Sequence, residues 1–383
     1  MDSKLPATGT TIFAVMSALA QECGAINLSQ GFPSFEPPQG LLDRVNHYLQ
    51  NSANQYAPMQ GTPALRHAVT DKLADLYDRE VDAATEITVT DGATEALFAA
   101  IHAVVHPDDE VIVLDPAYDS YEPAVTLAGG KTIHLPLITS TNNPDFHIDY
   151  DRLKEAITPK TRLIILNFPH NPTGAILAPS ELDTLAEIVR DTNVYLLSDE
   201  VYEHIVFDGQ RHWSLATHDE LWARSFVVSS FGKTYHATGW KVGYCAAPPE
   251  LTTEFRKIHQ WVCYTVITPV QLAIADFMKS TPEHHYGLPA FYQEKRDRFC
   301  ALIKNSRFNF RPAKGTFFQI LDYSGITDED DVEYSKKLTR EIGVASIPVS
   351  VFCEQALDAR LLRFCFAKDD DILEEAASRL CQL

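Results

Sequence analysis

The chain has 383 residues, of which 45% are hydrophobic and 22% are charged, a composition that is ordinary for a globular protein with a large core. Its 32 basic and 52 acidic residues give a formal net charge of −20 at pH 7, which disfavours nucleic acid and anionic membranes as partners. No apolar run approaches the ~20 residues of a membrane span, and the first residues do not resemble a secretion signal.

The cysteines and histidines bear on compartment and metal binding. The seven cysteines are widely spaced and form no CxxC pair, which favours reduced thiols in the cytoplasm over a disulfide framework or a zinc site. His102 and His106 are four residues apart on a predicted helix, a spacing that a metal can use. No further ligands cluster with them in the sequence, so we expect no metal.

Strands and helices alternate from about residue 86. The apolar strands are followed by helices, which predicts an α/β fold with a mostly parallel sheet covered on both faces. The predicted strands are 86–90, 111–114, 163–167, 194–198 and 226–229, and the clearest predicted helices are 94–101 and 180–191.

The pattern changes after about residue 280. A long helix at 282–305 and a helix at 332–342 are interleaved with strands at 316–321 and 361–366, which predicts a smaller α+β domain. The amino-terminal segment is expected to return to it. We therefore predict a large domain at 50–280 and a discontinuous small domain at 1–49 and 281–383.

Candidate site residues follow the strands of the predicted sheet. Gly92, Tyr118, Asn171, Asp199 and Ser230 each come at or shortly after the end of a successive strand. Ligands of parallel sheets bind beyond the carboxyl ends of the strands. Core packing does not require such a series, so it predicts one binding site at that edge.

Three local motifs sharpen this expectation. They are Asn171-Pro172-Thr173-Gly174, Ser198 to Tyr202, and Ser229 to His236, which contains Lys233. Each has an ordinary explanation by itself: a turn, a helix cap at Asp199, and a solvated surface lysine. Their order along the chain resembles the pyridoxal 5'-phosphate site of fold type I aminotransferases, which argues against those explanations.

The resemblance extends over nearly the whole chain. The sequence is similar to class I/II aminotransferases of the kynurenine aminotransferase-like branch, and most similar to the bacterial methionine aminotransferases of that branch. It implies a seven-stranded sheet between helices. The segments that carry it are 27–33, 54–59, 90–96, 116–121, 169–174, 198–204, 229–244 and 363–368.

The family's catalytic groups map onto three residues of this chain. The resemblance implies that Lys233 bonds to the cofactor aldehyde and later moves the substrate's α-proton. Asp199 would keep the pyridine nitrogen protonated, and Tyr202 and Asn171 would hydrogen-bond the ring's phenolic oxygen. Either Asn171-Pro172 or Phe168-Pro169 is a candidate for a cis peptide.

The remaining parts of the cofactor site are implied in the same way. Gly92, Ala93 and Thr94 would offer the start of a helix to the phosphate, together with Ser230 and Lys241. Lys241 stands where many class I members have arginine, so it offers a point charge without the planar fork. Tyr118 would stack on the pyridine ring, although a buried core aromatic is the alternative.

Substrate binding and assembly are implied as well. Arg363 lies within an apolar strand and would bind the substrate carboxylate, although a structural ion pair is the alternative. Gly31 and Phe32 would close over the substrate. The family forms homodimers with shared active sites, in which Tyr56 would reach the partner's cofactor phosphate.

We therefore expect a ping-pong amino transfer from methionine or an aromatic amino acid to a 2-oxo acid. One alternative is a kynurenine/glutamine-type transaminase with β-lyase activity on cysteine S-conjugates, which release of pyruvate would reveal. Another is a non-catalytic regulator, which usually carries an extra DNA-binding domain. The short segment before residue 50 and the charge of −20 disfavour that alternative.

Overall fold

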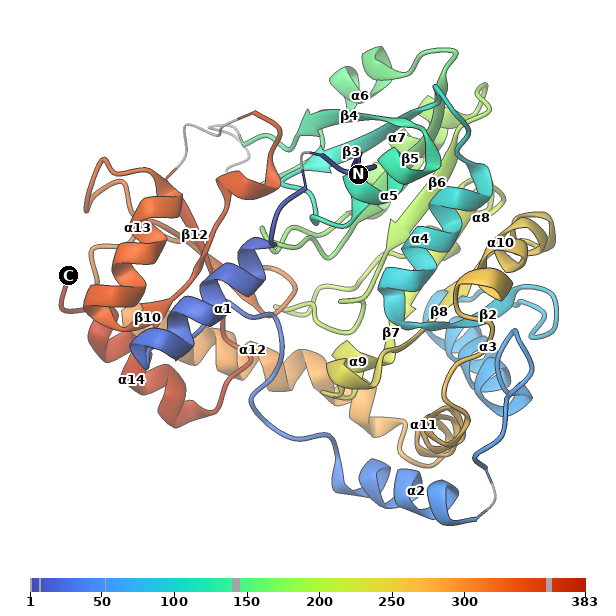
Figure 1. Cartoon of the computed structure of the whole chain (residues 1–383), viewed down its shortest axis with the longest axis horizontal. Helices are drawn as coiled ribbons and strands as arrows, with labels where there is room; N and C mark the ends of the chain where they lie inside the picture. The colour runs from blue at the N-terminus through green and yellow to red at the C-terminus, as the bar shows by residue number, and fades with distance from the viewer. Residues whose placement is uncertain (1, 7, 52, 140–144, 356–359) are drawn as a thin grey trace.

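The computed structural model describes residues 2–6, 8–51, 53–139, 145–355 and 360–383 (Figure 1). Its centre is a seven-stranded sheet in the order β2-β8-β7-β6-β5-β3-β4. β8 runs antiparallel to both of its neighbours, and the other pairs are parallel, so the predicted α/β fold is confirmed. The strands are β2 (Ile87–Asp91), β3 (Glu110–Asp115), β4 (Lys131–Pro136), β5 (Thr161–Asn167), β6 (Tyr195–Asp199), β7 (Ser225–Ser230) and β8 (Val242–Ala246).

Helices cover both faces of this sheet (Figure 1). Alternate residues of a strand point to opposite faces, so Val111 and Val113 join one apolar core while Ile112 and Leu114 join the other. The first core lies against α4 (Gly92–Val104), α5 (Tyr121–Ala128) and α10 (Pro249–Val262). The second lies against α3 (Pro63–Tyr77), α6 (Tyr150–Ala156), α7 (Pro179–Val189), α8 (Asp219–Trp222) and α11 (Thr268–Ser280).

A second group of elements surrounds its own core, which contains Phe299, Leu321 and Phe364. Its antiparallel sheet has the order β11-β12-β9, and a separate parallel pair joins β1 to β10. The strands are β1 (Ile26–Asn27), β9 (Phe318–Asp322), β10 (Val344–Ala345), β11 (Ile347–Pro348) and β12 (Leu361–Cys365). The helices are α1 (Ile12–Cys23), α12 (Glu283–Ile303), α13 (Asp331–Lys337) and α14 (Asp370–Leu380).

The amino-terminal segment contacts both groups. α1 lies beside β10 and β11, whereas α2 (Gln39–Gln50) packs against α11, as Figure 1 shows. The division at residues 50 and 280 stays a prediction, and α2 is the element that it assigns to the small domain although α2 contacts a helix of the large sheet.

One strand differs in detail from the sequence prediction. The strand expected from Thr316 begins at Phe318 because Thr316 has a left-handed backbone with φ of 64°. Among the described helices, none is both long and apolar enough to cross a bilayer.

Candidate functional site

A cavity of about 330 Å³ lies at the carboxyl ends of the central strands. All of the site residues proposed from the sequence line it except Phe32 and Tyr56. The lining residues proposed from the sequence are Gly31, Gly92, Ala93, Thr94, Tyr118, Asn171, Asp199, Tyr202, Ser230, Lys233, Lys241 and Arg363.

Lys233 lies on the short helix α9 (Phe231–Thr234), directly after β7. Its Nζ donates to the carbonyl oxygen of Gly31 at 2.7 Å and lies 5.4 Å from the centroid of the Tyr202 ring. Burial lowers the pKa of Lys233 to about 8, and the nearby positive charge of Arg363 acts in the same direction. A substantial fraction of this amine is therefore neutral and nucleophilic in mildly alkaline solution.

Asp199 is the last residue of β6 and is only 4% exposed. Tyr121 donates its hydroxyl to Oδ2 at 2.7 Å, and the side-chain amide of Asn167 donates to the backbone carbonyl at 2.9 Å. Burial raises the pKa of Asp199 to about 6, although Tyr121 and the charge of Lys233 oppose the rise. In the described part of the chain Asp199 forms no ion pair, so a cation in the cavity would stabilise it.

Arg363 lies in β12 and is almost fully buried. Its Nη1 donates to Oδ1 of Asn171 at 2.8 Å, and its Nη2 donates to the carbonyl oxygen of Ser29 at 2.7 Å. The buried Nε has no hydrogen-bond partner among the described residues. Burial lowers the pKa of Arg363 to about 10. A guanidinium with an unused donor on a cavity wall is suited to an incoming carboxylate.

Aromatic rings surround this guanidinium. Its Cζ lies 4.0 Å from the ring centroid of Phe318 and 5.2 Å from that of Phe13, and both side chains line the cavity. Rings at these distances attract the cation and help to stabilise its charge in a buried position.

The start of α4 forms another wall. Gly92 has φ of 66°, and a side chain there would also lie within 3.1 Å of Nζ of Lys241. That Nζ lies 3.4 Å from Oγ1 of Thr94. Ser230 caps α9, and its Oγ accepts the backbone N–H of Gly232 at 3.2 Å. This wall combines helix N–H groups, hydroxyls and one cation, which is the donor set that a phosphate requires.

The two tyrosines of the cavity have different surroundings. Tyr118 lies at its rim, with its ring 5.6 Å from that of Tyr121 in an edge-to-face arrangement. Tyr202 is buried and packs its ring 5.1 Å from that of Phe317. Both of the candidate peptides, Asn171-Pro172 and Phe168-Pro169, are cis, and so is Asp115-Pro116.

Phe32 and Tyr56 lie outside the cavity. Phe32 is exposed beside Lys368, whose Nζ donates to the carbonyl oxygen of Phe32 at 2.8 Å. Tyr56 is 82% exposed, and its ring lies 5.6 Å from that of Tyr264.

Sequence reasoning missed some residues of the cavity. Asn167 lines the cavity, and Tyr121 contacts Asp199 from outside that lining; sequence reasoning recognised them only as members of a strand and a motif. The position of Asn167 at the end of β5 was the signal that could have found it. The other lining residues that were missed as site residues are Phe13, Gln30, Leu97, Val201, Thr238 and Phe318.

The two histidines considered for a metal have different partners in the structure. His102 stacks on Phe98 and contacts its carbonyl oxygen through Nδ1 at 3.0 Å. His106 lies beyond the end of α4, beside Asp109.

The residues of the cavity fit pyridoxal 5'-phosphate. The buried carboxylate of Asp199 matches its ring cation and the neutral fraction of Lys233 matches its aldehyde, while the unpartnered Nε of Arg363 matches the carboxylate of an amino-acid substrate. The absence of a side chain at Gly92 leaves room beside Lys241 for the phosphate.

Comparison with known proteins agrees with this geometry. The sequence matches the family described as aminotransferase class I and II over residues 24–380. It is 49% identical to a methionine aminotransferase of Escherichia coli (strain K12), covering 100% of this chain and 98% of that protein. It is 38% identical to a probable N-succinyldiaminopimelate aminotransferase of Mycobacterium tuberculosis (100% and 98%) and 34% identical to a kynurenine–oxoglutarate transaminase of Dictyostelium discoideum (98% and 94%).

A solved structure shows the same fold. The crystal structure of YbdL from Escherichia coli, identified as having a methionine aminotransferase function, superposes with a TM-score of 0.97 at 48% identity, over 100% of this chain and 99% of that chain. The resemblance seen in the sequence is therefore confirmed. The chain belongs to the class I and II aminotransferases, enzymes that use pyridoxal 5'-phosphate to move an amino group from an amino acid to a 2-oxo acid.

Proposed function

We propose that the amino donor is an amino acid with a large uncharged side chain, namely methionine or an aromatic amino acid. The acceptor is a 2-oxo acid, and the two half-reactions follow one another in a ping-pong order. The observation that supports an uncharged substrate side chain is the set of cations in the cavity. Among the described residues of one chain that line it, these are Lys233, Lys241 and Arg363.

Each of these cations has a separate task in the proposal. Lys233 bonds to the aldehyde, Lys241 faces the phosphate and Arg363 binds the α-carboxylate of the substrate. None of them is left for a second carboxylate on the substrate side chain. The lining also contains Phe13 and Phe318, which favour apolar groups. The methionine aminotransferase of Escherichia coli, at 49% identity, supports this choice.

The chemistry begins at Lys233. When bound, pyridoxal 5'-phosphate supplies an aldehyde carbon and a ring that accepts the electrons released when the substrate's Cα–H bond breaks. The neutral fraction of the Lys233 amine would be the group that condenses with that aldehyde, with release of water. With a substrate amine in its place, Nζ of Lys233 would be the base that holds the proton leaving the substrate Cα.

Asp199 holds the ring nitrogen in its protonated form. A carboxylate whose pKa is raised by burial gains most from a cationic partner, and Asp199 has none among the described residues. Tyr121 orients that carboxylate. Tyr202 and Asn171 would donate to the phenolic oxygen of the ring, and Tyr118 would stack on it.

Arg363 orients the substrate. We propose that its guanidinium receives the α-carboxylate while Asn171 and Ser29 hold it in place from the other side. Gly31 and Phe32 then lie over the bound substrate and exclude water. A Cβ at position 31 would lie 2.7 Å from Cζ of Phe318, so the close contact of this backbone with Phe318 requires glycine.

We also propose a homodimer with shared active sites. Trp261 is 83% exposed, and Val262, Tyr264 and Ile267 are exposed on the same stretch of chain, beside the exposed ring of Tyr56. An apolar patch of this kind is suited to a second copy of the chain. Tyr56 would then reach the partner's phosphate.

The cytoplasmic location stays a prediction.

The test is a comparison of kcat/KM for methionine, phenylalanine and kynurenine with that for aspartate and glutamate. We expect the uncharged donors to be favoured by at least about 100-fold, because an unpaired charge in an apolar pocket is costly. Equal or better use of glutamate would contradict the substrate class. Pyruvate released from a cysteine S-conjugate without amino transfer would favour the lyase alternative.

A matched pair of variants tests the role of Lys233. Lys233→Ala is expected to abolish amino transfer, whereas Lys257→Ala, at an exposed position on α10, is expected to leave it unchanged. Full turnover in Lys233→Ala would contradict the proposed site.

A further inference from the structure

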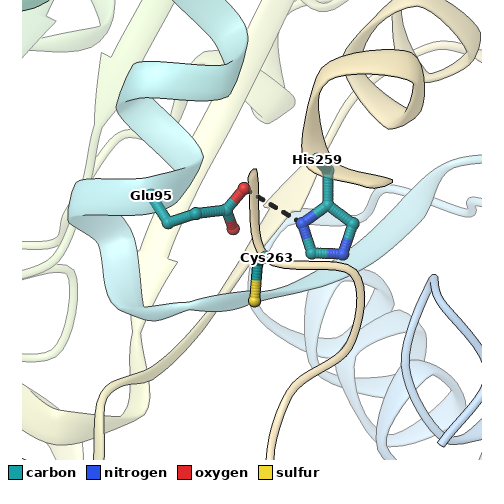
Figure 2. A group of neighbouring side chains, drawn as sticks. All are labelled: Glu95, His259 and Cys263. Carbon is teal, nitrogen blue, oxygen red and sulfur yellow. Dashed lines mark hydrogen bonds and ion pairs between the residues drawn. The ribbon is translucent and has the colours of Figure 1, made fainter. Parts of the chain in front are cut away.

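A group of mostly buried side chains joins the first turn of α4 to the end of α10 (Figure 2). It consists of Glu95, His259 and Cys263, whose ligand-type atoms all lie within 4.8 Å of one another. Glu95 comes directly after Thr94 at the proposed phosphate wall, and His259 is 0% exposed. The group therefore sits next to the proposed cofactor site without lining its cavity.

The hydrogen bonds of His259 connect two segments of the site. Its Nδ1 contacts Oε1 of Glu95 at 3.0 Å, and its Nε2 contacts the carbonyl oxygen of Met59 at 2.9 Å. Glu95 in turn accepts the backbone N–H of Asp91 at 3.3 Å through Oε2. One imidazole thus joins the first turn of α4 to the segment that carries Tyr56.

The partners of His259 indicate how many protons its ring carries. A backbone carbonyl only accepts hydrogen bonds, and so does an ionised carboxylate. Both contacts of His259 are therefore satisfied together only when both ring nitrogens carry protons. Burial lowers the pKa of His259, but the hydrogen bond and charge of Glu95 more than offset this, so its pKa is raised above the ordinary value.

A metal ion is the other way to join the three groups, but the contacts do not favour it. Both ring nitrogens of His259 already have partners, and burial raises the pKa of the Cys263 thiol to about 11. Cys263 also contacts the carbonyl oxygen of Thr265 at 3.6 Å.

The charge of Glu95 matters because of its position. A carboxylate in the first turn of α4 competes with a phosphate for the positive end of the same helix. The other charges nearby are Asp91, which is exposed, Lys241, whose Nζ lies 3.4 Å from Oγ1 of Thr94, and Arg256, whose guanidinium is bound to Thr88 and to the carbonyl oxygens of Ala84 and Ile87. His259 is the side chain in direct contact with Glu95.

We infer that His259 is a positioning residue that carries two protons, cancels the charge of Glu95 beside the phosphate wall and fixes the segment of Tyr56. This inference rests on the proposed cofactor site. It predicts that the affinity for a phosphate-bearing cofactor depends on the sum of the charges at positions 95 and 259, and not only on their shapes.

A double-mutant cycle on the full-length protein tests this. The readout is the equilibrium binding of pyridoxal 5'-phosphate, and separately of pyridoxal, to cofactor-free protein, with inorganic phosphate as a competitor. His259→Gln leaves the charge of Glu95 uncompensated. We expect this variant to bind pyridoxal 5'-phosphate about tenfold more weakly, the order expected for one charge acting through the protein interior. The affinity for pyridoxal, which lacks the phosphate, is expected to change little.

Glu95→Gln keeps the acceptor for Asp91 and removes the charge. We expect it to bind the cofactor at least as tightly as the wild type, and the double variant Glu95→Gln/His259→Gln to recover most of the affinity lost in His259→Gln. A double variant as weak as His259→Gln, or an equal loss for pyridoxal, would show a merely structural role and overturn the inference.

Two controls separate the other outcomes. A stoichiometric divalent metal in the purified enzyme that is lost in Cys263→Ser would also overturn the inference, because a metal ion and not a proton would then join Glu95 to His259. Lys241→Gln tests the phosphate wall itself. If Lys241→Gln does not weaken the binding of pyridoxal 5'-phosphate relative to that of pyridoxal, the proposed phosphate wall is wrong. If Lys241→Gln weakens this binding but His259→Gln does not, only the inference about His259 is wrong.

Discussion

Asp199 and Glu203 lie four residues apart, and both carboxylates are buried. Glu203 is surrounded by donors: Nζ of Lys72 at 2.6 Å, the hydroxyl of Tyr77 at 2.6 Å and the hydroxyl of Ser229. Asp199 accepts a side-chain hydrogen bond from one neutral phenol, that of Tyr121. Burial raises the pKa of both carboxyls, but the donors and the charge of Lys72 reverse the effect for Glu203, whose pKa is well below the ordinary value.

We interpret this contrast as the difference between a carboxylate that stabilises the fold and one that is available to a ligand. The hydrogen-bonding capacity of Glu203 is used within the protein, so its charge stabilises the folded chain. Asp199 keeps its charge at a cost and faces a cavity, so its favourable partner must come from outside the chain. We expect the two residues to respond in opposite ways to removal of the charge.

The largest effect is expected from Glu203→Gln. The substitution leaves Lys72 as an uncompensated buried cation, and breaking a buried pair in this way costs about 3–5 kcal/mol of unfolding free energy. Denaturant unfolding measures the loss. Glu329→Gln, which removes an exposed partner of Lys337, is the control and should have little effect. A similar loss in both variants would remove the distinction drawn for Glu203.

Asp199→Asn is expected to act on turnover. An amide cannot keep the ring nitrogen protonated, so kcat should fall by about 10²–10³, the range seen when one preorganised electrostatic contact is removed. Asp208→Asn, which removes a carboxylate paired with Arg296 away from the cavity, is the control. Turnover within threefold of the wild type would refute the role of Asp199.

The same substitution should stabilise the cofactor-free protein. Because the folded-state pKa of Asp199 lies above its ordinary value, its carboxylate destabilises the fold above pH 6, and stability is recovered as the pH falls from about 6 toward 3.8. The rise from 3.8 to about 6 corresponds to about 3 kcal/mol as an upper limit. Thermal unfolding of cofactor-free Asp199→Asn at pH 8 and pH 4 checks this: the gain should be present at pH 8 and absent at pH 4. A loss of stability at pH 8 would contradict the comparison.

The smallest effect is expected from Tyr121→Phe. Loss of the hydroxyl removes the hydrogen bond that lowers the pKa of Asp199, so the carboxylate is a poorer partner for a cation. We expect kcat to fall by about tenfold, because a hydrogen bond to a charged group contributes about 1.5–3 kcal/mol, only part of which affects turnover. Tyr150→Phe, which removes a tyrosine contact with Glu181 far from the cavity, serves as the control. An equal effect of both would show that Tyr121 does not act through Asp199.

The sequence was most informative where a local pattern had one physical solution. The continuous apolar strands predicted the parallel sheet, and the polar residues that follow them line the observed cavity. It was less informative for β4, whose residues are mostly half-buried and show no apolar run, and for β8, whose antiparallel direction depends on its neighbours. The packing of α2 on α11 was equally hidden, since Leu41 is the one fully buried residue of α2 and gives little apolar signal.

The amino-acid sequence by itself determined the family, the sheet and most of the residues that line the cavity, because each depends on short segments with a fixed spacing. The tertiary structure alone decided the surroundings of those residues. Arg363 donates hydrogen bonds to Asn171, 192 residues away in the sequence, and to Ser29, 334 residues away. Tyr121 donates to Asp199, which is 78 residues away. The pKa values of these groups depend on burial and on partners that only folding brings together, which is why two carboxylates in one short segment have opposite electrostatic environments.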